Sequence, residues 1–354
     1  MDIHQILAGF AEGDAISREA TQLRDIFRRW GYISDLFVDT DHVAPDLRTA
    51  CRPLGEYIGR PGDICLHHYG LASPAADLFF ASPARKIIVY HNVTPAKYFV
   101  GIDDAVAAQL RTARATLPEL GRKTDAIWAV SQFDANDLQA AGLRAVKVFP
   151  LLYNPPPATL KPDWRILAQF AGSLKTILFV GRIAPNKRIE DLIQAFAWYH
   201  RALNPYSRLL IVGSPRSAPR YFTLLRMLAG DLDLPNVCFE GFASPAGLEA
   251  YYQVADLYVS ASEHEGYCLP LVEAMDHDIP VIARAVGGTP EAMGSGGILY
   301  EDLKAEELGV LMHRVLTDSA LRNETLRSQR ERIRKLRERS VESELKALLA
   351  GFLT

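Results

Sequence analysis

The stretch Ser262–Met275 reads SEHEGYCLPLVEAM and begins two residues after the end of a short apolar, β-rich run at Leu257–Ser260. Pro270 suits the first turn of a helix, where its missing N–H group costs nothing. Gly266 allows the backbone to approach a ligand closely. The stretch therefore predicts a strand, a loop and then a helix whose N-terminal amides can face a ligand.

Two glutamates in this stretch make it more than a structural junction. Glu265 lies in the predicted loop, and Glu273 lies about one turn into the predicted helix. The N–H groups of Tyr267–Leu271, except at Pro270, and the positive end of the helix dipole would attract a phosphate or a sugar oxygen. Carboxylates accept hydrogen bonds from the hydroxyl groups of sugars and riboses. Either glutamate alone is more often structural, but the pair in this context predicts a ligand site.

A second strand end carries two cations. The stretch FVGRIAPNKR at Phe179–Arg188 predicts a strand that ends at Gly181, followed by Arg182 and Lys187 in the next loop. Arginine offers bidentate hydrogen bonds and lysine a point charge, which together suit a diphosphate. Such a pair of cations usually lies on the surface without a function. We assign it a role in ligand binding only because the motif at Glu265 is also present.

The strand pattern divides the chain into two halves. A chain of 354 residues is long for one hydrophobic core, and apolar runs alternate with helical patterns as in βαβ units. Tyr153–Pro157 (YNPPP) cannot continue a strand or helix and marks the boundary. The expected strands are Ile3–Ala8, Ile33–Val38, Asp63–Leu66, Lys86–Tyr90, Ala126–Val130 and Val146–Leu152, then Thr176–Val180, Arg208–Val212, Val237–Glu240, Asp256–Ser260, Pro280–Ala283 and Ile298–Tyr300.

Composition narrows the class of protein. The net charge of −3 and the pI near 6.3 give no reason to expect a nucleic-acid partner. Four scattered cysteines fit a reducing compartment, and no apolar run approaches the roughly 20 residues that span a bilayer. We expect a cytoplasmic protein. Peripheral contact with the inner membrane face stays open because Arg327–Arg339 is strongly basic, although a solvated helix face is the simpler interpretation.

These motifs together resemble the retaining glycosyltransferases of family 4, which carry an EX7E motif. The likeness rests on Gly181-Arg182 with Lys187 and on Glu265-x7-Glu273. Further motifs agree, and they are LLIVG (209–213), VCFEGF (237–242), YYQVAD (251–256) and VGGTPE (286–291). The resemblance is continuous from about Thr176 to Tyr300.

The resemblance implies the α/β fold called GT-B, in which two Rossmann-like domains face each other across a cleft. Residues 1–153 would form the N-terminal, acceptor-side domain, joined by the C-terminal helix 341–354. Residues 158–338 would form the C-terminal domain that binds the nucleotide sugar.

The resemblance also implies site residues. Arg182 and Lys187 would hold the diphosphate, Glu265 would contact the donor sugar and Glu273 the ribose. The implied catalytic set is His91, Arg182, Lys187 and Glu265, and the implied donor-binding set is Gly13, Arg182, Lys187, Gly241, Phe242, Glu265, Gly266, Tyr267, Cys268, Leu269 and Glu273. Cys268 departs from the family pattern, because a glycine is commoner there.

The N-terminal half matches the family more loosely. Gly13 could approach the donor phosphate or simply start a helix. His91 follows the predicted strand Lys86–Tyr90, and the segment Val89–Asn92 is similar to the family's active-site histidine segment. A single histidine at a strand end is more often structural. His67-His68 could suggest a metal, but no third ligand stands at a recognisable spacing. We therefore expect no metal site.

The implied function is transfer of a sugar from a GDP- or UDP-linked donor to a glycan, lipid-linked or small-molecule acceptor, as in polysaccharide biosynthesis. Fixed cations would replace a metal ion, so no cofactor is expected. Two alternatives remain, a sugar-nucleotide epimerase of the same fold and a non-catalytic carbohydrate-binding protein. A Rossmann dehydrogenase is less favoured, because the stretch Ala8–Gly13 is not GxGxxG.

Overall fold

The structure is a computed structural model that describes residues 1–43 and 45–353, and it separates into two compact units. The change of unit between Leu152 and Tyr153 lies beside the proline-rich segment. The predicted boundaries differ from the structure at Tyr98–Asp103 and Tyr153, which group with the second unit, and at Arg339, where the chain already returns to the first. Unit 1 comprises Met1–Lys97, Asp104–Leu152 and the segment from Arg339 onward; unit 2 comprises Tyr98–Asp103 and Tyr153–Glu338. Thr354, the last residue of the predicted segment 341–354, lies outside the described residues.

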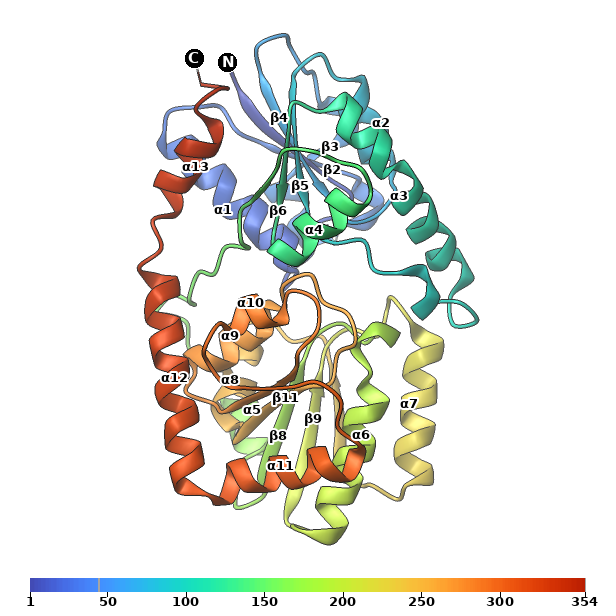
Figure 1. The fold of residues 1–354 in the computed structure, drawn as a ribbon, viewed down its shortest axis with the longest axis vertical. Helices are drawn as coiled ribbons and strands as arrows, with labels where there is room; N and C mark the ends of the chain where they lie inside the picture. Colours follow the sequence, from blue (N-terminus) through green and yellow to red (C-terminus); the bar gives the residue numbers. More distant parts are fainter. Residues whose placement is uncertain (44, 354) are drawn as a thin grey trace. The chain divides into compact units, whose positions relative to one another are not determined.

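Unit 1 is built on a parallel sheet in the order β3-β2-β1-β4-β5-β6-β7 (Figure 1). Each of the six predicted strands overlaps a strand of this sheet. The unpredicted strand is β3, because its two exposed residues leave no apolar run. The strands are β1 (Ile3–Leu7), β2 (Leu36–Val38), β3 (Arg52–Pro53), β4 (Ile64–Tyr69), β5 (Arg85–Tyr90), β6 (Ala126–Ala129) and β7 (Val146–Val148).

The helices of unit 1 cover this sheet with apolar faces. In α1, Leu23 and Phe27 are fully buried, and the Asp14 side chain caps the helix by accepting from the Ser17 N–H. The α-helices are α1 (Ala15–Arg29), α2 (Pro74–Ala81), α3 (Asp104–Lys123), α4 (Gln132–Ala140) and α13 (Val341–Leu349). Short 3-10 helices are η1 (Thr40–His42), η2 (Pro45–Ala50), η3 (Leu54–Glu56) and η4 (Ala96–Tyr98), the last of which ends in unit 2.

The helix α13 lies beside α1 within unit 1 (Figure 1). The Glu342 carboxylate accepts hydrogen bonds from Arg29 at 2.7 Å and from the Trp30 indole N–H at 3.0 Å. Leu345 and Leu349 are fully buried. The segment after residue 338 therefore completes the first unit rather than the second.

Unit 2 has a parallel sheet in the order β10-β9-β8-β11-β12-β13, and all six predicted strands are present. The strands are β8 (Lys175–Val180), β9 (Ser207–Val212), β10 (Val237–Gly241), β11 (Leu257–Ser260), β12 (Val281–Arg284) and β13 (Ile298–Tyr300). The helices are α5 (Trp164–Gln169), η5 (Pro185–Lys187), α6 (Ile189–Ala202), α7 (Pro219–Asp231), α8 (Pro245–Val254), α9 (Leu269–Asp276), α10 (Thr289–Met293), α11 (Ala305–Thr317) and α12 (Ser319–Arg337).

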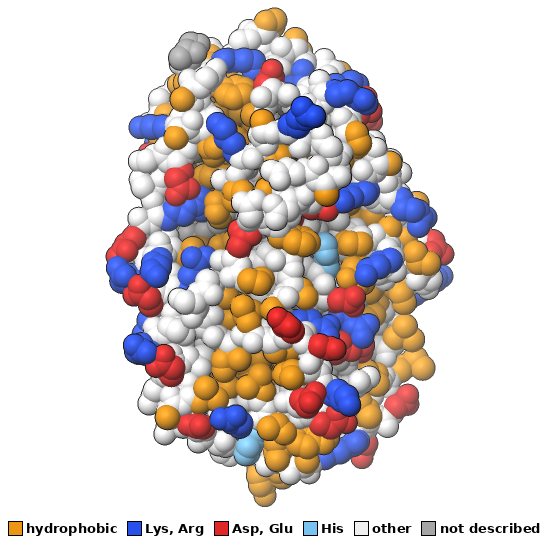
Figure 2. All heavy atoms as spheres, in the orientation of Figure 1, with side chains coloured by type: hydrophobic (Ala, Val, Ile, Leu, Met, Phe, Trp, Pro, Cys, Tyr) orange, Lys and Arg blue, Asp and Glu red, His pale blue; other side chains and the backbone are white. Residues whose placement is uncertain are grey.

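The basic segment falls mostly on α12, where its charges pair along the helix. Arg334 bonds to Glu331 and to Glu338, and Arg327 bonds to Glu324. Gln329 is buried and joins α12 to the Ile279 carbonyl and the Val281 N–H. On the face drawn in Figure 2, basic and acidic side chains are interspersed. Among the described residues, no helix is long and apolar enough to span a bilayer.

Candidate active site

The two motifs of unit 2 meet because β8 and β11 are neighbours in the sheet. Both strands run in parallel, so the loops that follow them leave the same edge. The Asn186 side-chain amide donates to the His264 carbonyl at 3.1 Å, and the Glu263 N–H donates to the Asn186 carbonyl at 2.9 Å. These bonds fasten one predicted motif to the other.

Lys187 and Glu265 form a partly buried ion pair at this junction. The lysine Nζ lies 2.7 Å from each carboxylate oxygen, and the side chains are 15% and 7% exposed. Burial raises the pKa of the Glu265 carboxyl, but the charge and hydrogen bonds of Lys187 outweigh it, so the pKa lies below its ordinary value. The sequence predicted both residues at the site but not that they would bind each other.

Arg182 differs from Lys187 in having no such partner. Its side chain is exposed, and no hydrogen bond or ion pair involves the guanidinium in the part of the chain that the structure describes. The two cations and the carboxylate therefore leave a net charge of about +1, carried mainly by Arg182. An anionic ligand would meet Arg182 as a free donor and Lys187 as a donor that Glu265 already shares.

The helix α9 begins as the sequence predicts, with Pro270 in its first turn. The preceding residue, Cys268, has a left-handed backbone with φ of 71°. That conformation explains why a glycine is commoner there. One expectation is wrong: the Leu271 N–H is bonded to the Cys268 carbonyl at 3.2 Å, so it is not a free donor. Leu269, the first residue of α9, is buried.

Glu273 lies on α9 and is 6% exposed. Its carboxylate accepts a hydrogen bond of 2.8 Å from the Tyr252 hydroxyl of α8. The phenol donor fixes one oxygen of the carboxylate. Tyr252 belongs to the YYQVAD motif, so the sequence held the signal for this contact.

A glycine pair lets another loop pack directly behind Glu265 and Gly266. The Gly288 N–H donates to the Glu265 carbonyl at 2.9 Å. A Cβ atom added at Gly288 would lie 1.9 Å from the Gly266 carbonyl oxygen, and one at Gly287 would lie 2.0 Å from the Glu265 carbonyl oxygen. Side chains are therefore excluded at both positions, which explains the VGGTPE motif.

Gly241 and Phe242 follow at the same edge of the unit 2 sheet. Gly241 ends β10 with a φ of 71°, and its carbonyl accepts from the Gly213 N–H at 2.7 Å. The Phe242 side chain is 55% exposed. An exposed ring at a strand end can stack on a ligand such as a base.

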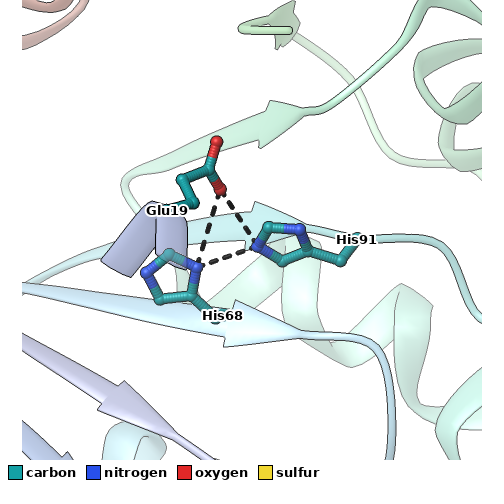
Figure 3. Close-up of side chains that lie close together, drawn as sticks. All are labelled: Glu19, His68 and His91. Carbon is teal, nitrogen blue, oxygen red and sulfur yellow. Dashed lines mark hydrogen bonds and ion pairs between the residues drawn. The ribbon is translucent and has the colours of Figure 1, made fainter. Parts of the chain in front are cut away.

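In unit 1, the predicted Gly13 and His91 occupy different settings. Gly13 is exposed, with a φ of 74°, and the cap of α1 is Asp14 rather than Gly13. His91 follows β5, and its side chain is 4% exposed. Its Nε2 lies 2.8 Å from the Nδ1 of His68, whose ring is stacked on it (Figure 3).

Glu19 is a site residue that sequence reasoning missed. Figure 3 shows it against His68 and His91, with its Oε2 3.9 Å and 3.4 Å from their facing nitrogens. These three atoms lie close enough together to contact a single metal ion. The overlooked signal is the spacing of Glu19 with Leu23 and Phe27 on α1, which places the carboxyl on the buried face of the helix.

The electrostatics of this cluster are those of neutral groups. Burial raises the pKa of the Glu19 carboxyl to about 8 and lowers the pKa of His91 to about 3. Burial also lowers the pKa of His68 well below its ordinary value. The neighbouring His67 is buried on the other face of the sheet and bonds to the Ile6 carbonyl at 2.9 Å. It is thus a core residue.

The comparisons with known proteins start from the sequence. The family model described as "Glycosyl transferases group 1" matches residues 162–335. The chain is 33% identical over 107 residues to an alpha-monoglucosyldiacylglycerol synthase of Acholeplasma laidlawii, covering 30% of this chain and 26% of that protein. It is 30% identical over 154 residues to a mannosylfructose-phosphate synthase of Agrobacterium fabrum, covering 42% and 34%. The matched stretches thus span about a quarter to a third of these relatives.

Solved structures extend the likeness to the whole fold. A sucrose-phosphate synthase from Thermosynechococcus elongatus superimposes with a TM-score of 0.78 at 21% identity, covering 100% of this chain and 99% of that one. Anabaena HepE, solved in complex with UDP and glucose, has a TM-score of 0.71 at 17% identity, covering 99% and 100%. The chain therefore has the GT-B fold, and its residues 162–335 match the family of group 1 glycosyl transferases.

Proposed function

We propose that the protein is a retaining, metal-independent glycosyltransferase that moves a sugar from a UDP- or GDP-linked donor to a glycan, lipid-linked or small-molecule acceptor. The observation that carries this proposal is the Lys187–Glu265 ion pair, together with an Arg182 that has no polar partner among the described residues, in the loops that follow the neighbouring strands β8 and β11. The names of the relatives support it, since they include a GDP-mannose-dependent mannosyltransferase and a protein solved with UDP-glucose.

The cations would act on the leaving group. As the bond between the sugar C1 and the diphosphate oxygen breaks, negative charge grows on the diphosphate, and Arg182 and Lys187 stabilise it. Fixed donors of this kind contribute about 100- to 1,000-fold in rate each. Glu265, whose oxygens lie at the same junction, would accept hydrogen bonds from the donor sugar, and Glu273 would hold the ribose.

Retention of configuration needs no covalent intermediate on the protein. In a front-face displacement, the acceptor oxygen bonds to C1 on the side from which the diphosphate leaves. The acceptor hydroxyl then passes its proton to the departing phosphate oxygen, so both bonds and the proton balance. His91 would serve as a further hydrogen-bonding group.

The absence of a metal requirement has a direct test. Turnover measured with excess EDTA should equal turnover without it, because Arg182 and Lys187 supply the positive charge. Loss of turnover on chelation, restored by magnesium or manganese, would refute this part of the proposal.

The donor and the reaction type can be tested together. A thermal-shift screen of UDP- and GDP-sugars should identify a donor that raises the melting temperature. Release of nucleoside diphosphate from that donor should then depend on an added acceptor. Conversion of the donor without an acceptor would favour an epimerase, and binding without turnover on any acceptor would favour a carbohydrate-binding protein.

A further inference from the structure

Three adjacent strands of unit 1 bring a line of polar side chains together on one face of the sheet. Gln5 lies on β1, His68 on β4, and His91 directly follows β5. The Gln5 Oε1 is 2.8 Å from the His68 Nε2, and the His68 Nδ1 is 2.8 Å from the His91 Nε2. Gln5 and His68 are 0% and 3% exposed, so water does not compete for these bonds.

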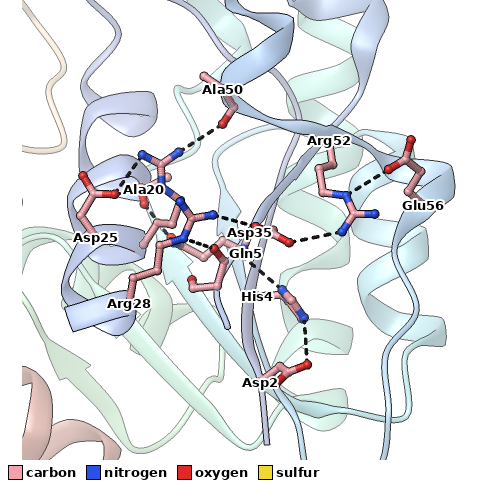
Figure 4. Close-up of polar contacts among 12 residues, drawn as sticks. Asp2, His4, Gln5, Ala20, Asp25, Arg28, Asp35, Ala50, Arg52 and Glu56 are labelled. Atoms are coloured by element: carbon pink, nitrogen blue, oxygen red, sulfur yellow. Dashed lines mark hydrogen bonds and ion pairs between the residues drawn. The ribbon is translucent and has the colours of Figure 1, made fainter. Parts of the chain in front are cut away.

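The contact between Gln5 and Ala20 decides which atom donates in each hydrogen bond of this line. The Gln5 side-chain amide donates to the Ala20 carbonyl at 2.9 Å (Figure 4). A carbonyl oxygen can only accept, so the amide NH₂ must face Ala20 and the amide oxygen must face His68. Turning the amide over would place two oxygens against each other in a buried site, which is costly.

Each following proton is then determined. Because Gln5 presents an acceptor, the His68 Nε2 must carry a proton, and a neutral His68 has a bare Nδ1. That nitrogen needs a donor, so the His91 Nε2 carries a proton, and the Nδ1 of a neutral His91 is left with its lone pair. No hydrogen bond reaches the His91 Nδ1 from the described residues, and it is not one of the fully buried atoms without a partner.

We propose that Gln5 and His68 are positioning residues that hold His91 in its Nε2–H form, so that its Nδ1 accepts a hydrogen bond from a hydroxyl group of the ligand. The role of His91 toward a ligand rests on the proposed function, whereas the form of the ring does not. A neutral acceptor favours a sugar hydroxyl over a phosphate oxygen, which would need a donor.

Glu19 reinforces the neutral state of the ring. Its Oε2 is fully buried and makes no hydrogen bond among the described residues, although it lies 3.4 Å from the His91 Nε2. Since burial raises its pKa to about 8, the carboxyl is mainly protonated at pH 7 and supplies little charge to stabilise an imidazolium. The described residues around His91 therefore keep it uncharged.

The form of the ring can be measured directly in the full-length protein. Two-dimensional ¹⁵N NMR of histidine-labelled protein distinguishes the two neutral forms, and His91→Ala assigns the His91 signals. We expect the Nε2–H form in the wild type. In His68→Leu and Gln5→Met we expect a mixture of forms, because the donor requirement on His91 is lost. His67→Leu is the matched control: it removes a buried histidine of the same strand on the opposite face, and should leave the His91 signals unchanged.

Turnover provides the second readout. Gln5→Met and His68→Leu should each lower kcat about 5- to 10-fold, as expected for the loss of one hydrogen bond, whereas His67→Leu should not once folding is checked by circular dichroism. If His68→Leu does not fold, Gln5→Met alone decides.

An Nδ1–H form in the wild type, or an unchanged form in the folded variants, would overturn the inference. One equivalent of zinc bound by the wild type and lost in His68→Leu would also overturn it, because a metal would replace the Nε2 proton. If the ring is in the Nε2–H form but His91→Ala turns over normally, the ligand role of His91 fails and the assignment of the ring stands.

Discussion

Glu265 in unit 2 and Glu19 in unit 1 are both buried carboxyls, yet their pKa values are shifted in opposite directions. Lys187 donates twice to Glu265 and holds the pKa of Glu265 below its ordinary value against burial. Glu19 faces two neutral histidines, and burial raises the pKa of Glu19 to about 8. Burial alone therefore does not decide whether a carboxyl is charged; the nearest donor does. One unit keeps an ion pair near a proposed anion site, and the other keeps an uncharged network.

The largest expected effect comes from separating the ion pair. Lys187→Met leaves Glu265 buried without its partner, and should reduce the free energy of unfolding by about 3–5 kcal/mol in urea titrations. The double variant Lys187→Met with Glu265→Leu should recover much of this loss. The control is Lys175→Met, which breaks an exposed pair with Asp256 and should cost no more than about 1 kcal/mol. Equal losses at Lys187 and Lys175 would contradict the comparison.

Arg182→Ala tests the cation that has no carboxylate partner in the described part of the chain. Turnover should fall about 100- to 1,000-fold, equivalent to 2.7–4 kcal/mol of transition-state stabilisation. The urea midpoint should hardly change, because the side chain is exposed and makes no polar contact among the described residues. Arg327→Ala on α12 serves as the control. Normal turnover in Arg182→Ala would remove this residue from the proposed site.

Glu273→Gln probes a third buried carboxyl, which accepts a hydrogen bond from a tyrosine hydroxyl. If it binds the ribose, the affinities for nucleoside diphosphate and for nucleotide sugar should fall by the same amount. The loss of a charged hydrogen bond corresponds to about 1.5–3 kcal/mol, measured by calorimetry with both ligands. A selective loss of nucleotide-sugar affinity would instead assign Glu273 to the sugar.

The pH dependence of stability should separate the two carboxyls. Because the pKa of Glu19 is raised in the fold, its contribution is present below about pH 4.5 and is lost as the pH rises through about 8. Relative to Glu19→Gln, the wild type should lose up to about 1.4 kcal/mol per pH unit in this window. Glu265 has the opposite sign: its contribution is lost as the pH falls through its lowered pKa. Parallel curves for the wild type and Glu19→Gln would show that Glu19 is ionised in the fold. Glu119→Gln is the control, because the Glu119 side chain is 47% exposed and pairs with Lys123.

The smallest effect is expected at Cys268. Its left-handed backbone costs about 1–2 kcal/mol in a residue with a Cβ. A glycine would avoid this cost, but its greater conformational freedom in the unfolded chain would cancel part of the stabilisation. Cys268→Gly should therefore raise the free energy of unfolding by no more than about 1 kcal/mol. A clear loss of stability would show that the thiol beside Glu265 matters more than the backbone.

The sequence predicted the site residues of unit 2 better than those of unit 1, for physical reasons. The strands that flank Arg182 and Glu265 are continuous apolar runs, and their loops begin where those runs end, so the motifs could be placed at one edge of a sheet. Periodicity does not indicate which side chain pairs with which, so the Lys187–Glu265 bond could not be foreseen. Glu19, Gln5 and His68 come from three separate elements, and their meeting depends on the β1-β4-β5 order and the packing of α1. The edge strand β3 was missed because two exposed residues have no pattern to detect.

The return of the chain to unit 1 after residue 338 has a consequence for biosynthesis. Arg339 donates to the Pro150 carbonyl at 2.7 Å and lies over the Phe149 ring, while α13 packs beside α1. During translation, the segment Tyr153–Glu338 of unit 2 is synthesised before Arg339 and α13. The surface of unit 1 that binds α13 therefore stays uncovered until unit 2 has been synthesised. Unit 1 can complete its folding only after that point.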